Sequence, residues 1–278
     1  MLLNEVLARD IAQCRPAPGA CAFWWLGQIG FAVKTASATL YFDLFLSELN
    51  ERLFPPPLRA ELIADADIVF GSHDHIDHID DPVWRAVAQR SPQARFALPA
   101  GLAEAVSGRL GIPRERMLPL ADGQTVEVGG VTVSAVATAH EKLNDRDENV
   151  GFIVRADGVT ICHLGDTCMY EGLISKLKAA GPIDLMILPI NGRDARRLHR
   201  GCLGNMTFQE AVDLVGEVRP RLAVPAHYEM IEGNTEDPYR FAAYLEIKYP
   251  ERDFWIGPHA TRVMLPGASE QAASMVGD

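Results

Sequence analysis

Residues 71–82 read GSHDHIDHIDDP and place three histidines and four aspartates within twelve positions. The residues just before them, ADADIVF at 64–70, end in an apolar run typical of a buried strand. Burying so many titratable groups without a partner is energetically costly, and packing gains nothing from them. Imidazole and carboxylate groups are ligands of borderline divalent metals. The segment therefore predicts a metal-binding loop at the end of a strand.

Three further strand-like segments end in a residue of the same kinds. His140 closes VTVSAVATAH, Asp166 closes GVTICHLGD and His227 closes RLAVPAH. Ligand sites in α/β sheets form outside the carboxyl ends of the strands. We therefore expect these residues to meet His73 and its neighbours at one edge of the fold.

Spacing within the cluster divides its side chains between two ions. His73 and His75 are two residues apart, which places them on one side of an extended segment. Asp77 and His78 are adjacent and point differently, which suits a second ion. We expect one ion at His73, His75 and His140, a second at Asp77, His78 and His227, and Asp166 as the bridge between them. Coordination then stays open for water, as in catalytic metal sites.

The order of the segments predicts an α/β fold with two mixed sheets. Residues 125–140 and 149–167 read as hairpins, the second with its turn at Asp157-Gly158. Residues 182–190, 206–218 and 220–230 read as strand, helix and strand, with a Thr207/Glu210 capping box at the helix start. Hairpins require antiparallel pairs, so a doubly wound parallel sheet fits less well. We expect one domain over residues 1–278, with helices outside two sheets and a loose tail from about residue 267.

Composition argues against several classes of partner. The net charge of −11 speaks against a surface for nucleic acid or anionic membranes, because such surfaces need basic patches. The apolar runs are too short to cross a bilayer. Five cysteines occur without a C-x-x-C pair, which favours reduced thiols in a cytoplasm. We therefore expect a cytoplasmic protein with no nucleic-acid or membrane partner.

Taken together, the motifs resemble those of the metallo-β-lactamase superfamily. HDHIDH at 73–78, ATAH at 137–140, LGDT at 164–167 and VPAH at 224–227 follow the order found in that superfamily. WWLGQIGFAVKT at 24–35, SHDHIDHID at 72–80, LGDT and MTFQEA at 206–211 are similar to the branch that contains L-ascorbate-6-phosphate lactonase, and the resemblance runs from about Phe23 to Glu236. It implies a four-layer αββα sandwich, two Mn²⁺ or Zn²⁺ ions on the ligands named above, and cytoplasmic homo-oligomers.

The ligand set and the resemblance predict a metal-dependent hydrolase. Two ions lower the pKa of bound water to roughly 7, so that a metal-bound hydroxide attacks a carbonyl or phosphoryl centre. Asp77 and Asp166 are the expected catalytic carboxylates: Asp166 bridges the ions, and Asp77 also orients the nucleophile and accepts its proton. Asp43, which resembles an aspartate at the end of an early strand in the superfamily, is expected to accept a hydrogen bond from a ligand imidazole. The expected substrate is a small anionic metabolite, a lactone such as L-ascorbate 6-phosphate or a related sugar-acid lactone.

The loop NGRDARRLHRGCLGNM at 191–206 concentrates positive charge in an acidic protein. It follows the strand-like segment IDLMILPI, which puts it on the same edge as the metal ligands. We expect Arg193, Arg196 and Arg197 to bind the charged end of the substrate, with Tyr228 lining the pocket. A solvated helix face or a subunit contact is the alternative for this loop. His163, His199 and His259 are expected to be ordinary polar residues.

Other functions compete with the lactonase interpretation. Phosphodiester hydrolysis, of nucleic acid or of a phospholipid, occurs on the implied fold, but the net charge and the lack of a basic or amphipathic insertion disfavour it. Redox di-iron proteins of this scaffold resemble H-x-E-x-D-H, and here His75 stands at the position of the glutamate. A structural or regulatory metal site fits less well, because the ligand set leaves coordination open.

Overall fold

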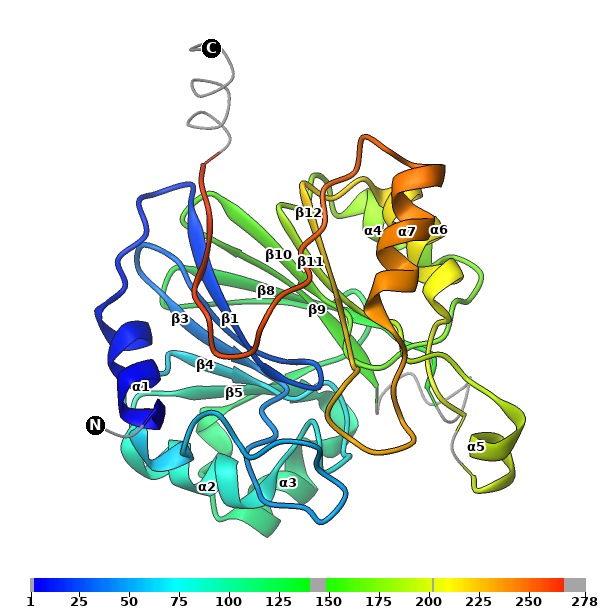
Figure 1. Ribbon diagram of the computed structural model, residues 1–278. Coiled ribbons are helices and arrows are strands. Elements are labelled where there is room, and N and C mark those ends of the chain that lie inside the picture. The colour runs from blue at the N-terminus through cyan, green and yellow to red at the C-terminus, as the bar shows by residue number, and fades with distance from the viewer. Residues whose placement is uncertain (1–2, 141–148, 202, 268–278) are drawn as a thin grey trace.

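Two β-sheets packed face to face form the centre of the computed structural model, which describes residues 3–140, 149–201 and 203–267 (Figure 1). Over these residues the first sheet has seven strands in the order β13–β1–β2–β3–β4–β5–β6. The strands from β13 to β3 pair antiparallel, and those from β3 to β6 pair parallel. They span Cys21–Gly27 (β1), Gly30–Lys34 (β2), Thr39–Phe42 (β3), Ile68–Phe70 (β4), Arg95–Pro99 (β5), Met117–Leu120 (β6) and Val263–Leu265 (β13).

The second sheet has six strands within the described ranges, in the order β12–β11–β10–β9–β8–β7. The strands from β7 to β10 pair antiparallel, and those from β10 to β12 pair parallel. They span Thr125–Val128 (β7), Val131–Ala137 (β8), Val150–Ala156 (β9), Val159–His163 (β10), Leu185–Pro189 (β11) and Leu222–Ala226 (β12). Both sheets are therefore mixed, and both predicted hairpins, β7–β8 and β9–β10, are confirmed.

Helices cover the outer faces of the two sheets (Figure 1). α1 (Leu3–Gln13), α2 (Asp81–Arg90) and α3 (Ala103–Leu110) pack on the first sheet, and α4 (Leu173–Ala179), α6 (Phe208–Val218) and α7 (Pro238–Lys248) pack on the second. The short helix α5 (Ala195–His199) projects from the body of the fold (Figure 1). Among the helices that the structure describes, none is both long and apolar enough to span a bilayer. The layers confirm the predicted αββα sandwich.

Strand β1 contributes to both hydrophobic cores of the protein. Phe23 and Trp25 face the core between the sheets, whereas Ala22, Trp24 and Leu26 face the core under α1, α2 and α3. All seven residues of β1 are buried. A strand covered on both faces needs no alternation of polar and apolar residues. Trp24 and Trp25 are thus core residues.

Local capping fixes the start of two helices. One begins at the end of residues 71–82, the His/Asp loop, and the other follows residues 191–206, the arginine loop. The Asp80 carboxylate accepts a hydrogen bond from the Val83 amide at the start of α2, where Pro82 stands in the first turn. Thr207 and Glu210 form the predicted capping box at the start of α6. α6 then connects the parallel strands β11 and β12, which confirms the predicted strand-helix-strand unit.

The apolar run at residues 21–35 is interrupted at Gln28, where the chain reverses between β1 and β2 with a positive φ of 54°. One local expectation differs from the structure. Residues 71–80 form bends and turns, so His73 and His75 do not lie on an extended segment as predicted. The turn instead brings the two rings together, with His73 Nε2 and His75 Nδ1 2.7 Å apart. The predicted tail falls on residues 268–278, outside the described residues.

Candidate metal centre

Loops that follow four strands from both sheets supply the centre. His73 follows β4 of the first sheet, while His140, Asp166 and His227 follow β8, β10 and β12 of the second. Each residue lies within three positions of the end of its strand. The carboxyl ends of these strands therefore place the residues at one edge of the sandwich, as the sequence predicted.

Three imidazoles form the first group of the centre. The ligand atoms of His73, His75 and His140 all lie within 4.8 Å of one another. Burial, followed by the adjacent His78, holds the pKa of His73 well below its usual value, and burial likewise lowers the pKa of His140. These two rings are therefore neutral at pH 7 and have nitrogen lone pairs available for a cation.

Asp77, His78 and His227 form the second group, and their ligand atoms meet the same 4.8 Å limit. Asp77 Oδ2 lies 3.6 Å from the Nε2 atoms of both His78 and His227. Burial alone would raise the pKa of Asp77, but the positive character of His78 and His227 lowers it. The group therefore contains an ionised carboxylate between two imidazoles.

Asp166 lies between the two groups and presents one oxygen to each. Its Oδ1 is 3.1 Å from His227 Nε2 and 3.6 Å from His78 Nε2, while its Oδ2 is 3.7 Å from His140 Nε2. Burial would raise the pKa of Asp166, yet His227 and His78 hold it well below its usual value. The side chain is thus a carboxylate at neutral pH with one oxygen toward each group.

Three atoms of the metal-ligand candidates lack the partner that burial normally requires. Within the described residues, His78 Nε2, Asp166 Oδ1 and His227 Nδ1 are buried and make no hydrogen bond, and the first two face each other. Such groups destabilise a folded protein unless something satisfies them. A cation held by imidazole and carboxylate ligands would satisfy the two that face each other, and this donor set is typical of borderline divalent metals. The residues present therefore fit a metal ion.

Asp43 holds His78 in position from behind. Its carboxylate accepts hydrogen bonds from the Ser72 amide (2.8 Å), from Ser72 Oγ (2.7 Å) and from His78 Nδ1 (2.6 Å). The bond to Nδ1 leaves His78 Nε2 facing Asp77 and Asp166. Gly165 permits this packing, because a Cβ there would lie 2.4 Å from the Ser72 side chain.

The four aspartates of the His/Asp loop have different partners. Asp77 joins the second group, whereas Asp80 caps α2 and accepts hydrogen bonds from Ser47. Asp74 and Asp81 both pair with Arg109 of α3, which donates two hydrogen bonds to Asp74. Three of the aspartates therefore fix the loop, and one faces the centre.

Sequence reasoning missed Gln28, which reaches the second group from the turn between β1 and β2. Its side chain is fully buried, and Nε2 donates to Asp77 Oδ2 (2.9 Å) and lies 3.2 Å from His227 Nε2. The signal was a single amide between two glycines, GQIG, inside an otherwise apolar run. Such a pattern marks a turn that carries a buried polar group.

The three remaining histidines lie outside the centre. His163 is buried against Phe42, with Nε2 2.8 Å from the Ile29 carbonyl oxygen. His259 packs against the rings of Trp25 and Phe54, where burial lowers its pKa to about 4. His199 is exposed on α5.

Two of the arginines in the arginine loop form hydrogen bonds with neighbouring residues of the protein. Arg193 donates two hydrogen bonds to Glu210 and one to the Asn205 carbonyl, and Arg197 donates to Asp194, Asn234 and the Asn191 carbonyl. Arg196 is exposed on α5, and its guanidinium makes no hydrogen bond or ion pair within the described part of the chain.

This loop also adjoins the centre. The Gly204 carbonyl oxygen lies 3.2 Å from His140 Nδ1, and the Met206 amide donates to the Thr167 carbonyl next to Asp166. Tyr228, expected to line the pocket, is instead buried in the core with its ring centroid 4.8 Å from that of Trp25.

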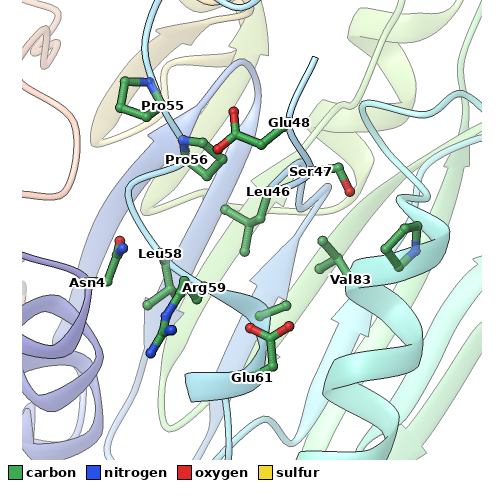
Figure 2. A pocket seen from close by; sticks show the side chains of 12 residues that line it. Asn4, Leu46, Ser47, Glu48, Pro55, Pro56, Leu58, Arg59, Glu61 and Val83 are labelled. Carbon is green, nitrogen blue, oxygen red and sulfur yellow. The ribbon is translucent and has the colours of Figure 1, made fainter. Parts of the chain in front are cut away.

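A separate hollow of about 400 Å³ lies between α1, the segment 46–61 and the start of α2. Figure 2 shows Leu46, Leu58 and Val83 on its walls, with Glu48, Arg59 and Glu61 around it. None of the residues of the two groups of the centre lines it. Within the described chain, its lining contains no histidine and no group of candidate metal ligands. The candidate site is therefore the centre at the strand ends.

Comparison with known proteins identifies the family. The Beta-lactamase superfamily domain matches residues 39–228, from the start of β3 to just past His227. The chain belongs to the metallo-β-lactamase superfamily. Within it, the chain is 30% identical over 238 residues to a UPF0173 metal-dependent hydrolase of Pyrobaculum arsenaticum, covering 84% of this chain and 96% of the relative. This places it among the UPF0173 metal-dependent hydrolases.

Two further proteins extend the match. A UPF0173 metal-dependent hydrolase of Opitutus terrae is 29% identical over 249 residues, which cover 87% of this chain and 96% of that relative. Igni18, a metallo hydrolase of Ignicoccus hospitalis, superimposes with a TM-score of 0.68 at 18% identity, over 88% of this chain and 98% of Igni18. At that identity, the superposition supports the fold alone.

Proposed function

We propose that this protein is a hydrolase that works with two divalent ions, Mn²⁺ or Zn²⁺. His73, His75 and His140 would hold one ion, Asp77, His78 and His227 the other, and Asp166 would bridge them. The observation that carries the proposal is the position of Asp166, whose two oxygens face the two groups separately. The unpartnered His78 Nε2 and Asp166 Oδ1 support it.

The residues of the centre have distinct parts in this chemistry. When bound, two such ions lower the pKa of water to roughly 7 and polarise the oxygen of the scissile group. Asp77 remains a carboxylate because its pKa is lowered, so it can accept a proton from the attacking water. Asp43 keeps His78 oriented, as carboxylate partners of ligand histidines do.

A small anionic metabolite is the substrate that we propose, with a sugar-acid lactone such as L-ascorbate 6-phosphate as the specific candidate. The arginine loop supports an anionic substrate, because it adjoins His140 through Gly204 and carries the exposed Arg196. The motifs shared with the lactonase branch support the lactone.

Metal-free protein titrated with Mn²⁺ or Zn²⁺ at pH 7 should bind two equivalents and release at least about one proton per chain, with a further contribution from a bound water whose pKa is near 7. Burial opposes a charge on His78, but Asp77, Asp166 and Asp43 raise its pKa well above the usual value, so an ion at Nε2 must displace a proton. His73 and His140, with lowered pKa values, should release none.

Calorimetry in two buffers of different ionisation enthalpy measures the released proton directly. Hydrolysis should disappear on chelation and return with the second equivalent of metal. Binding of one equivalent or none, or activity that survives confirmed metal removal, would contradict the proposal.

The Arg196→Ala substitution should raise KM for an anionic lactone roughly 10- to 150-fold, because a charge-assisted hydrogen bond contributes about 1.5–3 kcal/mol. A neutral lactone, assayed with the same variant, should show little change because the metal groups are intact. Equal effects on both substrates would remove the support that the arginine loop gives to an anionic substrate.

A further inference from the structure

The Gln28 amide faces the second metal group with its donor end. Its Nε2 contacts two atoms that would bind a cation, Asp77 Oδ2 at 2.9 Å and His227 Nε2 at 3.2 Å. Its Oε1 is buried and makes no hydrogen bond within the described residues. Without a cation this orientation is favourable toward Asp77, since an amide oxygen in the same place would face the carboxylate oxygen, which is also an acceptor.

A cation in the second group would reverse this preference. Rotating the terminal amide by 180° exchanges the positions of its oxygen and nitrogen. The oxygen would then stand beside Asp77 Oδ2 and His227 Nε2, and the three acceptors would surround one ion. Amide oxygens are established ligands of divalent cations in proteins.

The spacing of these three atoms fits one face of a coordination shell. Ligand atoms about 2.0–2.1 Å from an ion are roughly 2.9–3.4 Å apart in octahedral or tetrahedral geometry. The Gln28 amide lies within this range of both neighbours, 2.9 Å from Asp77 Oδ2 and 3.2 Å from His227 Nε2, whereas these two atoms are 3.6 Å apart, slightly more than the range. No movement of the main chain is needed to bring the amide to the ion.

The backbone of Gln28 is fixed on both sides, so only its side chain is free to adjust. Its carbonyl oxygen accepts hydrogen bonds from the His227 amide (2.8 Å) and from Trp25 Nε1 (3.0 Å). Its positive φ of 54° is disfavoured for a residue that carries a side chain. Backbone strain of this kind is commonly kept where it positions a functional group.

We propose that Gln28 is a ligand of the second ion, through Oε1 after rotation of its amide. This inference rests on the proposed function, because it requires an ion at Asp77, His78 and His227. Gln28 lies outside the matched interval 39–228 and belongs to none of the His/Asp motifs of the chain. It would complete a set of ligands drawn from both sheets.

The test compares metal binding by wild type, Gln28→Met and Gln28→Glu, measured by calorimetry and by metal analysis after dialysis against Mn²⁺ or Zn²⁺. Methionine fills the space without a ligand oxygen, and glutamate supplies an oxygen but no N–H donor. In Gln28→Met the dissociation constant of the second equivalent should rise by about tenfold or more, while the first equivalent binds as in wild type. Gln28→Glu should bind the second equivalent at least as tightly as wild type.

Gln93→Met is the matched control. The Gln93 amide donates to the Ala66 carbonyl, which precedes β4, whereas the metal ligands follow β4. This variant should bind both equivalents as wild type does. Retention of the first equivalent and an unchanged far-ultraviolet circular dichroism spectrum separate a ligand effect from misfolding.

Each alternative outcome is informative. If Gln28→Glu binds the second ion as weakly as Gln28→Met, the amide acts only as a donor to Asp77 and the inference is overturned. Wild-type affinity in Gln28→Met overturns it as well, while leaving the two-ion proposal intact. A wild-type protein that binds a single ion would overturn both.

Discussion

The Asp166→Asn variant should fail to bind the second equivalent of metal, and its kcat/KM for hydrolysis should fall at least about a hundredfold. A larger fall is expected if both ions are released. The substitution removes the negative charge between the two groups while it keeps the size of the side chain. Outer partners of metal ligands already contribute 10- to 100-fold to affinity or activity, and a shared ligand should exceed that range. Metal analysis of dialysed protein and kcat/KM for one substrate are the measurements.

Asp157→Asn provides the control for this change. Asp157 lies before β10, at the opposite end from Asp166, and accepts hydrogen bonds from Thr35 and Ser37. Asparagine tolerates its positive φ of 52°. The control should keep both ions and full activity. Two equivalents of metal and wild-type hydrolysis in Asp166→Asn would show that Asp166 does not bridge.

Asp43→Asn should lower the free energy of unfolding of the metal-free protein by about 3–5 kcal/mol, the cost of breaking a buried ion pair from one side. The new amide N–H₂ cannot accept from both Ser72 Oγ and His78 Nδ1, which the carboxylate now satisfies. Urea unfolding measures the change. Asp67→Asn is the control, because Asp67 accepts from the Thr39 amide at the other ends of β3 and β4.

The difference between wild type and Asp43→Asn should also depend on pH. Burial opposes the charge on His78, but Asp77, Asp166 and Asp43 together raise its pKa well above the usual value. A histidine whose pKa is higher in the folded than in the unfolded protein stabilises the folded state. The full contribution is present below the unfolded pKa of about 6.5, and it is lost as pH rises through the folded pKa. The stability gap should therefore be largest in mildly acidic solution and shrink toward alkaline pH. A gap that widens with pH would contradict a charged His78.

Local patterns predicted the fold and the positions of the ligand-type residues well. Strand periodicity and the Thr207/Glu210 capping box are properties of neighbouring residues, so they could be read directly from the chain. The strand ends that carry His73, His140, Asp166 and His227 meet because sheet geometry brings such ends to one edge. The path of residues 71–80 could not be predicted in the same way, because bends there depend on contacts such as Asp74 with Arg109.

Partners distant in sequence explain what the residues alone could not give. Arg193 and Arg197 are bound to Glu210 and Asn234, 17 and 37 residues away. Tyr228 follows a ligand-type residue, yet the positive φ of 65° at His227 accompanies a turn that sends Tyr228 into the core. Gln28 lies 49 residues from Asp77, and no periodic pattern links the two.

The centre draws its residues from both halves of the sandwich: Gln28, Asp43 and residues 73–78 follow strands of the first sheet, and His140, Asp166 and His227 follow strands of the second. Ions held there would act as a removable cross-link between the two halves of the protein. Because an ion that binds only the folded state stabilises everything that must be in place to bind it, neither sheet could open at this edge while the ions stay. Loss of metal would thus weaken the contact between the two sheets at this edge. The equilibrium between docked and separated sheets would then depend on the concentration of free metal.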